Sequence, residues 1–193
     1  MAQETPASGL SDPSPNRRAS GNHGLVILYT GNGKGKTTGA LGLVLRAWGH
    51  GLRPCVIQFI KDERGRWGET IAAERLDIPW HAMGAGFTFL SQDLEHDRAC
   101  ALAGWALAKE VIADGNYDLV VLDEFTYPVT YGWLPAGEVI DWLHEHRPVN
   151  LDLVITGREA DPALVAYADL VTEMREVKHP YNRGVRARRG IEF

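Results

Sequence analysis

Short apolar runs alternate with longer amphipathic stretches along most of this chain. Six runs rich in Val, Ile and Leu are each expected to form a strand, at residues 25–30, 55–60, 78–83, 117–123, 151–156 and 169–174. Helical spacing of apolar residues marks four further stretches, at 36–48, 94–113, 136–146 and 162–167. Continuous apolar strands separated by helices are typical of a parallel sheet that is covered on both faces. We therefore expect an α/β fold with a mainly parallel central sheet of about six strands.

The turn after the first expected strand is rich in glycine and lysine. It matches the phosphate-binding pattern G-x-x-x-x-G-K-[ST], except that Thr30 stands at the first position. In such a loop, glycines let backbone N–H groups surround phosphate oxygens, lysine neutralises phosphate charge, and a threonine hydroxyl binds Mg²⁺. The residues expected to contact the nucleotide here are Gly31, Asn32, Gly33, Lys34, Gly35, Lys36, Thr37 and Thr38. This variant P-loop predicts a nucleotide-binding protein.

Two acidic residues end the fourth expected strand, and an arginine follows the fifth. Asp123 and Glu124 come directly after the run Leu-Val-Val-Leu, which is the Walker B arrangement of a P-loop protein. We expect both carboxylates, together with Thr37, to hold Mg²⁺ directly or through water. Arg158, in Thr-Gly-Arg, is expected to place its guanidinium on a phosphate.

Length, net charge, cysteine content and the apolar runs indicate which classes of protein this chain does not resemble. The chain has 193 residues, of which 45% are hydrophobic, and its formal net charge is −5. This length suits one domain, and an acidic chain is a poor general nucleic-acid binder. Cys55 and Cys100 lie among apolar residues without metal-ligand spacing, so we expect reduced thiols. Without an apolar run that could span a membrane or serve as a signal peptide, we expect a cytoplasmic protein with no membrane partner.

Together with the P-loop, several further strings resemble the corrinoid adenosyltransferases of the CobA type. The strings are 30–38, 58–61 (Gln-Phe-Ile-Lys), 83–88 (Met-Gly-Ala-Gly-Phe-Thr), 121–124 (Val-Leu-Asp-Glu), 156–158 (Thr-Gly-Arg), 168–174, 178–180 (Lys-His-Pro) and 190–193 (Gly-Ile-Glu-Phe). Their number and order carry the resemblance, which covers residues 22–193 and leaves 1–21 as a tail that we expect to be disordered.

The resemblance implies transfer of the 5′-deoxyadenosyl group of ATP to the Co(I) centre of a reduced corrinoid, with release of triphosphate. It also implies a RecA-like P-loop fold, Mg²⁺ as cofactor, a flavin or flavoprotein as electron donor, and a homodimer. Because Co(I) is itself the nucleophile, the protein has to align cobalt with C5′ and stabilise the departing triphosphate. Lys36 and Glu124 are the catalytic residues expected for the second task.

The resemblance assigns removal of the lower cobalt ligand to aromatic residues in the segment Gly-Phe-Thr-Phe. Phe87 matches the family, whereas Phe89 stands where the family more often has tryptophan. A phenyl ring can still exclude water from a corrin face, because burying aromatic area does not require the indole N–H. We therefore place both phenylalanines among the expected catalytic residues. Weaker candidates for the corrin pocket are four further aromatic residues, Trp67, Tyr127, Tyr131 and Trp133.

Two other functions use part of the same pattern. An ordinary P-loop ATPase would use Glu124 to activate water and would produce phosphate instead of triphosphate. A non-catalytic regulator would bind ATP or a corrinoid without turnover. Neither accounts for the Gly-Phe-Thr segment and the C-terminal strings together. The physiological corrinoid, and the choice between synthesis and salvage, cannot be read from these residues.

Overall fold

A single parallel sheet forms the centre of the molecule. The computed structural model describes residues 23–60, 67–84 and 93–191. The strands are β1 (Val26–Thr30), β2 (Pro54–Gln58), β3 (Trp80–Ala82), β4 (Leu119–Asp123), β5 (Asp152–Thr156) and β6 (Leu170–Glu173). All pairings are parallel, in the order β3-β2-β4-β5-β1-β6. The predicted six-stranded α/β fold is confirmed, and each strand lies within a run predicted from the sequence or overlaps it.

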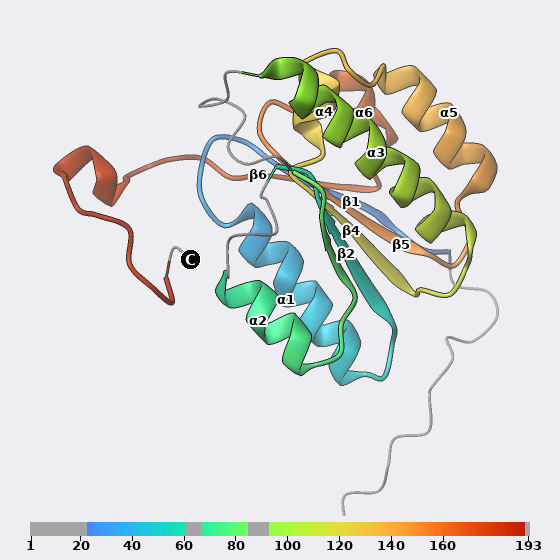
Figure 1. The fold of residues 1–193 in the computed structure, drawn as a ribbon, viewed down its shortest axis with the longest axis horizontal. Coiled ribbons are helices and arrows are strands. Elements are labelled where there is room, and N and C mark those ends of the chain that lie inside the picture. The colour runs from blue at the N-terminus through green and yellow to red at the C-terminus, as the bar shows by residue number, and fades with distance from the viewer. Residues whose placement is uncertain (1–22, 61–66, 85–92, 192–193) are drawn as a thin grey trace, which may run out of the picture.

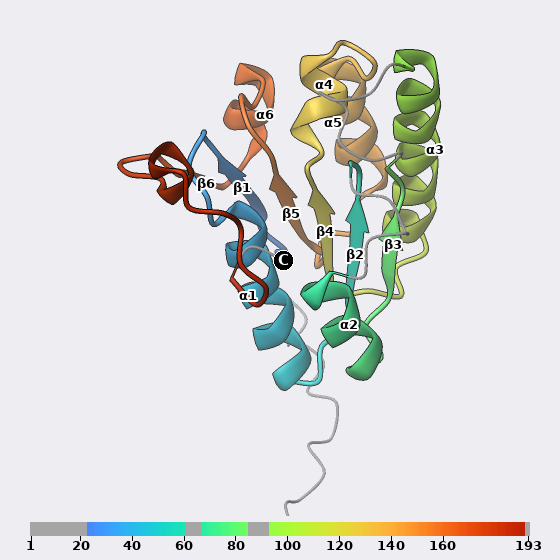
Figure 2. The same ribbon diagram turned by 60° about the vertical axis from the view of Figure 1, so that its left-hand side comes forward.

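Helices cover both faces of this sheet (Figures 1 and 2). On one face lie α1 (Lys36–Gly49) and α2 (Gly68–Arg75). On the other lie α3 (Leu94–Ala113), α5 (Ala136–His146) and α6 (Pro162–Tyr167), with the short α4 (Thr126–Thr130) beyond the end of β4. Each face has its own apolar cluster, because the central strands are buried on both sides. Strand β4, for example, alternates Val120 and Leu122 into one cluster with Val121 into the other.

The sequence pattern predicted α3, α5 and α6 with their observed bounds and missed two helices. Helix α2 has only eight residues, and α4 has five residues including Pro128, so neither shows a clear helical spacing of apolar residues. Both short helices matter for the site, because they lie at or next to the carboxyl ends of the strands.

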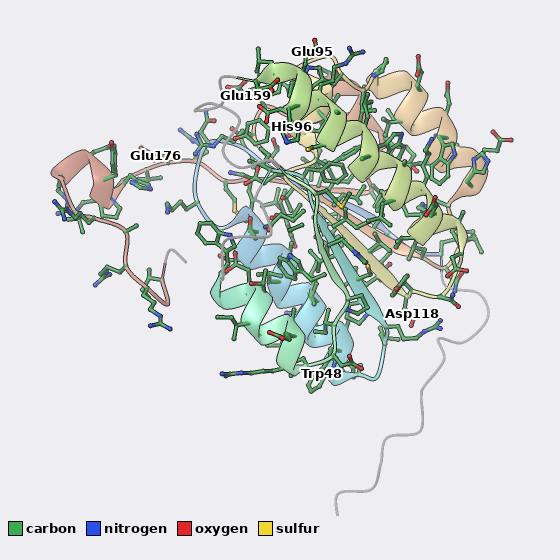
Figure 3. The ribbon with its side chains drawn as sticks, viewed as in Figure 1. Trp48, Glu95, His96, Asp118, Glu159 and Glu176 are labelled. Carbon is green, nitrogen blue, oxygen red and sulfur yellow. The ribbon has the colours of Figure 1, made fainter. Side chains whose placement is uncertain are left out.

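An arm follows β6 and extends away from the body of the molecule (Figures 1 and 2). It contains the 3₁₀ helix η2 (Pro180–Arg183), which the sequence pattern also missed. Asn182 donates a hydrogen bond to Glu176 at 3.2 Å, so the arm has its own local contacts (Figure 3). Beyond η2 the arm turns back, and Gly190 and Ile191 line the main pocket.

No helix in the described part of the chain is long and apolar enough to cross a membrane.

Candidate functional site: a phosphate pocket at the carboxyl edge of the sheet

The P-loop connects β1 to α1 and packs tightly against the chain that follows β6. Gly31 and Gly35 have φ angles of +91° and +112°, which side chains disfavour. The Gly33 N–H donates to the Met174 carbonyl at 2.6 Å. A Cβ on Gly31 would lie 2.5 Å from that same carbonyl oxygen. Glycine is therefore required here both for backbone conformation and for close approach to residue 174.

Lys36 opens α1 and is folded back over the loop. Its side chain is buried, and its Nζ donates to the carbonyls of Gly31 at 2.7 Å and Gly33 at 2.9 Å. Burial lowers the pKa of this ammonium below its usual value; the Glu124 carboxylate opposes that shift, Arg158 adds to it, and Asp123 opposes it. These two carbonyls hold the ammonium over the loop in the ligand-free protein. The N-terminal end of α1 adds its own partial positive charge.

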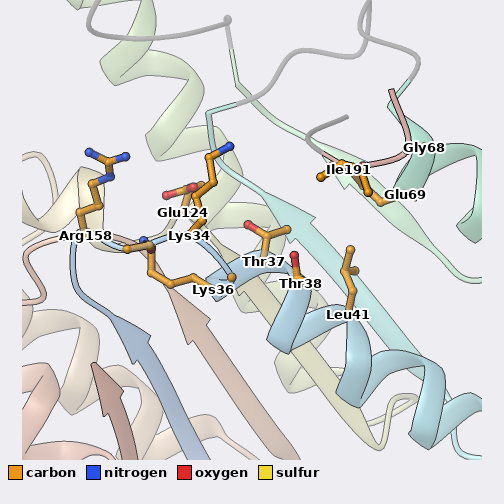
Figure 4. A pocket seen from close by; sticks show the side chains of 13 residues that line it. Lys34, Lys36, Thr37, Thr38, Leu41, Gly68, Glu69, Glu124, Arg158 and Ile191 are labelled. Carbon is orange, nitrogen blue, oxygen red and sulfur yellow. The ribbon is translucent and has the colours of Figure 1, made fainter. Parts of the chain in front are cut away.

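A pocket of about 630 Å³ opens above the loop (Figure 4). Three cationic side chains, Lys34, Lys36 and Arg158, line it together with the carboxylates of Glu69 and Glu124. The other lining residues are Gly33, Gly35, Thr37, Thr38, Leu41, Gly68, Gly190 and Ile191. The cations and the exposed N-terminal end of a helix make this pocket suited to a polyphosphate.

Asp123 and Glu124 are adjacent in sequence but occupy different environments. Glu124 has a φ of +60° and lines the pocket. Asp123 is fully buried, and its two oxygens accept hydrogen bonds from Thr156 Oγ1 at 2.6 Å and Gln58 Nε2 at 2.7 Å. Thr156 Oγ1 in turn accepts from the Glu124 N–H at 3.0 Å. Of the two acids at this strand end, Glu124 is the one that lines the pocket.

The turn that carries Arg158 is held by the short helix α4. Gly157 has a φ of +149°, and a Cβ there would lie 2.0 Å from Thr126 Oγ1. Thr126 Oγ1 donates to the Arg158 carbonyl at 2.6 Å. The single proton of the Thr130 hydroxyl is shared between the Thr126 carbonyl at 2.9 Å and the Glu159 carbonyl at 3.2 Å. Thr126, with a longer contact from Thr130, therefore holds the backbone that presents Arg158 to the pocket.

Three aromatic rings pack in series near Glu124, outside the set of residues that line the pocket. Tyr127 stacks on Tyr131 with ring centroids 6.2 Å apart, and Tyr131 packs on Trp133 at 4.9 Å. Burial raises the pKa of Tyr127 to about 12, and the nearby Glu124 carboxylate adds to the rise. Tyr127 therefore remains a neutral phenol at ordinary pH, while Tyr131 is 44% exposed. We call these three residues the aromatic ladder.

The structure brings most of the predicted nucleotide residues to one pocket. Gly33 to Thr38, Glu124 and Arg158 line it. Gly31, Asn32 and Asp123 do not line the pocket. The Gly31 carbonyl accepts a hydrogen bond from Lys36, Asn32 lies within the loop, and Asp123 is fully buried. Phe87 and Phe89 lie outside the described residues. Sequence reasoning missed Gly68, Glu69, Gly190 and Ile191 as lining residues, because no local pattern shows that α2 and the returning arm meet the P-loop.

Comparison with known proteins agrees with this pocket. Residues 22–193 match the model of the family described as ATP:corrinoid adenosyltransferase BtuR/CobO/CobP. The corrinoid adenosyltransferase of Escherichia coli K12 is 43% identical over 178 residues, which span 91% of this chain and 89% of that protein. The corrinoid adenosyltransferase CobA of Salmonella typhimurium LT2 is 44% identical over 88% of this chain and 86% of its own length. The corrinoid adenosyltransferase of Pseudomonas aeruginosa is 41% identical over 88% and 84%. The chain therefore belongs to the ATP:corrinoid adenosyltransferase family.

Proposed function

We propose that the pocket binds the triphosphate of ATP and holds it as one leaving group while the adenosyl group passes to a reduced corrinoid. In this reaction the Co(I) electron pair forms a bond to C5′, and the C5′–O bond breaks with its electrons going to triphosphate. The observation that carries the proposal is the P-loop pocket with Lys34, Lys36 and Arg158 around it. Attack occurs at carbon, so the protein has only to bind and neutralise the three phosphates.

The lining of the pocket is consistent with a reaction whose nucleophile comes from the substrate. Among the described residues that line it there is no Cys, His or Ser. The polar side chains are cations, carboxylates and the hydroxyls of Thr37 and Thr38. These are groups that bind phosphate and metal, as the proposed reaction requires.

We propose that Thr37 and Glu124 bind Mg²⁺. Both line the pocket, and both offer the oxygen donors that Mg²⁺ prefers. Within the described residues, no group of three or more His, Cys, Asp and Glu is placed to hold a metal. That suits Mg²⁺, which is commonly bound through one or two carboxylates plus substrate phosphates. Bound there, the ion would offset the charge that develops on triphosphate.

The corrinoid is proposed to lie against the aromatic ladder. Tyr127 is close enough to Glu124 and Arg158, two residues that line the pocket, for their charges to affect its pKa. The exposed Tyr131 and the half-buried Trp133 offer flat apolar area to a macrocycle. Phe87 and Phe89 remain the proposed residues for excluding the lower ligand of cobalt.

Two further properties belong to the same proposal. Electrons for cobalt are proposed to come from a reduced flavin or flavoprotein, as the family resemblance implies. A homodimer is proposed because the edge strand β6 exposes Leu170 and Val171, and the adjoining arm exposes Val177 and Tyr181. Sedimentation equilibrium tests the second point, and a monomer at micromolar concentration would contradict it.

Inorganic triphosphate tests the proposed leaving-group site directly. With Mg²⁺ present, triphosphate should compete with ATP and bind more tightly than pyrophosphate or phosphate, because it can contact more of the three cations that line the pocket. Lys36→Ala should weaken triphosphate binding, whereas Lys109→Ala on α3 should not, since Lys109 does not line the pocket. Binding measured by calorimetry with equal affinity for phosphate and triphosphate would contradict the proposal.

A further inference from the structure

We propose that Gln58, Asp123 and Thr156 act as positioning residues that fix Glu124 for Mg²⁺, with Asp123 serving as a buried acceptor and not as a metal ligand. We call these three residues the buried polar chain. The inference rests on the proposed metal-binding role of Glu124. It assigns new roles to Gln58 and Thr156 and refines the role expected for Asp123.

Sheet register places the buried polar chain across three neighbouring strands. Gln58 ends β2 and is the register partner of Asp123, which ends β4. Thr156 ends β5, the next strand of the sheet. All three residues have 0% exposed area, although each is polar. Polar side chains buried this deeply are costly unless they are hydrogen-bonded. The hydrogen bonds of Asp123 and Thr156 offset that cost, whereas Gln58 is bonded only through its Nε2, and its Oε1 has no partner among the described residues.

The hydrogen bonds converge on the Asp123 carboxylate, and one branch of them starts at the Glu124 N–H. Gln58 Nε2 and Thr156 Oγ1 both donate to Asp123, which occupies one acceptor site on each carboxylate oxygen. The Thr156 hydroxyl, oriented by donating to Asp123, presents its lone pair to the Glu124 N–H. A threonine hydroxyl has a single proton. Its bond to the carboxylate therefore determines that it acts as an acceptor towards Glu124.

The residue at the end of this series has an unusual backbone. Glu124 has a φ of +60°, a left-handed conformation that glutamate adopts rarely. The following residue, Phe125, is fully buried and packs on Phe59 and Trp105, which restrains the chain on the other side. The hydrogen bond to Thr156 and the packing of Phe125 together hold the backbone that directs Glu124 into the pocket.

Thr156 offers a matched pair of substitutions. Thr156→Val keeps the shape of the side chain but removes its hydrogen bonds to the Asp123 carboxylate and the Glu124 N–H. Thr156→Ser keeps the hydroxyl and loses only a methyl group. We would measure ATP binding by calorimetry with and without Mg²⁺ for the wild type and both variants. Metal-free ATP affinity should stay within about twofold in all three, because the P-loop and Lys36 are unchanged. The enhancement of affinity by Mg²⁺ should persist in Thr156→Ser and fall about 10- to 100-fold in Thr156→Val, as expected for a supporting residue of a metal site.

The outcomes separate this inference from the function on which it rests. If Thr156→Val keeps the full Mg²⁺ enhancement, or Thr156→Ser loses it equally, the positioning role is overturned and the metal site stands. If Mg²⁺ gives no enhancement even in the wild type, the metal assignment itself is overturned. A second measurement needs no variant: the Glu124 amide should exchange slowly with solvent in the ligand-free protein, and fast exchange would contradict the hydrogen bond to Thr156.

Discussion

At the scale of single residues, the site depends on where a few charges are held before any ligand arrives. The Lys36 ammonium rests on two carbonyls of its own loop, at 2.7 and 2.9 Å. Its lowered pKa reflects the cost of burying a charge that is only partly compensated. A bound polyphosphate would supply that compensation, so the lysine should contribute more to binding ATP than to holding the fold together.

Lys36→Ala is expected to reduce transfer to near the limit of detection and leave the protein folded. Activity should fall by about 100- to 1000-fold, comparable to the loss of one group that stabilises charge in a transition state. The melting temperature should change little, because the side chain is stabilised mainly by loop carbonyls and leaves no apolar cavity. Parallel activity and thermal-unfolding measurements check both parts. A folded variant with wild-type turnover would remove Lys36 from the site.

Glu124→Gln is expected to weaken metal-dependent turnover without eliminating it. The amide keeps an oxygen donor but loses the charge, so the Mg²⁺ concentration for half-maximal rate should rise about 10- to 100-fold. Excess Mg²⁺ should restore much of the rate, which a Mg²⁺ titration of transfer would show. Near-total loss at every Mg²⁺ concentration would instead indicate that Glu124 acts as a base, as in a hydrolytic ATPase.

At the scale of elements, short segments at the carboxyl ends of the strands shape the pocket. The longer helices α1, α3 and α5 could be predicted because each has enough residues for its apolar spacing to repeat. Helix α4 could not, since five residues with a proline show no helical period. Yet its Thr126 and Thr130 hold the turn that presents Arg158. Those contacts join residues about thirty positions apart, which no local pattern reveals.

Gly157→Ala is expected to destabilise the protein by about 2–4 kcal/mol, because the backbone is strained and a methyl group would overlap Thr126. Gly42→Ala is the matched control. Gly42 lies within α1, and a methyl group there would meet no atom of the described residues within 4 Å. Alanine at this position should therefore stabilise the helix by about 0.5–1 kcal/mol. Urea unfolding measures both, and equal effects of the two substitutions would contradict the contact with Thr126.

Phe87→Ala is expected to harm reactions that start from a Co(II) corrinoid more than reactions given prereduced Co(I). The ring is proposed to help remove the lower ligand, a step that precedes alkyl transfer. Phe89→Trp should be tolerated, although a larger ring can cost about 1–3 kcal/mol where the site is tight. Initial rates from the two cobalt states check this, and equal losses for Phe87→Ala would assign the residue to general packing.

At the scale of the whole molecule, the strand order brings the parts of the site together. Strand β5 lies between the P-loop strand β1 and the carboxylate strand β4, so Thr156 reaches Asp123 beside it. This is the RecA-like arrangement expected from the resemblance, and ligands of such sheets bind beyond the carboxyl ends of the strands. The chemistry of the P-loop was evident from residues 31–38 alone. The different environments of Asp123 and Glu124 were not, because burial distinguishes two acids that are neighbours in sequence.

The stoichiometry of products tests the central claim most directly. With ATP, Mg²⁺ and a Co(I) corrinoid kept anaerobic, adenosylated corrinoid and intact triphosphate should appear in equal amounts, because attack at C5′ breaks no P–O–P bond. Absorbance spectra quantify the corrinoid, and ion chromatography quantifies the phosphates. ADP and phosphate formed at the corrinoid-dependent rate, with no Co–C bond, would contradict the account and indicate an ATPase.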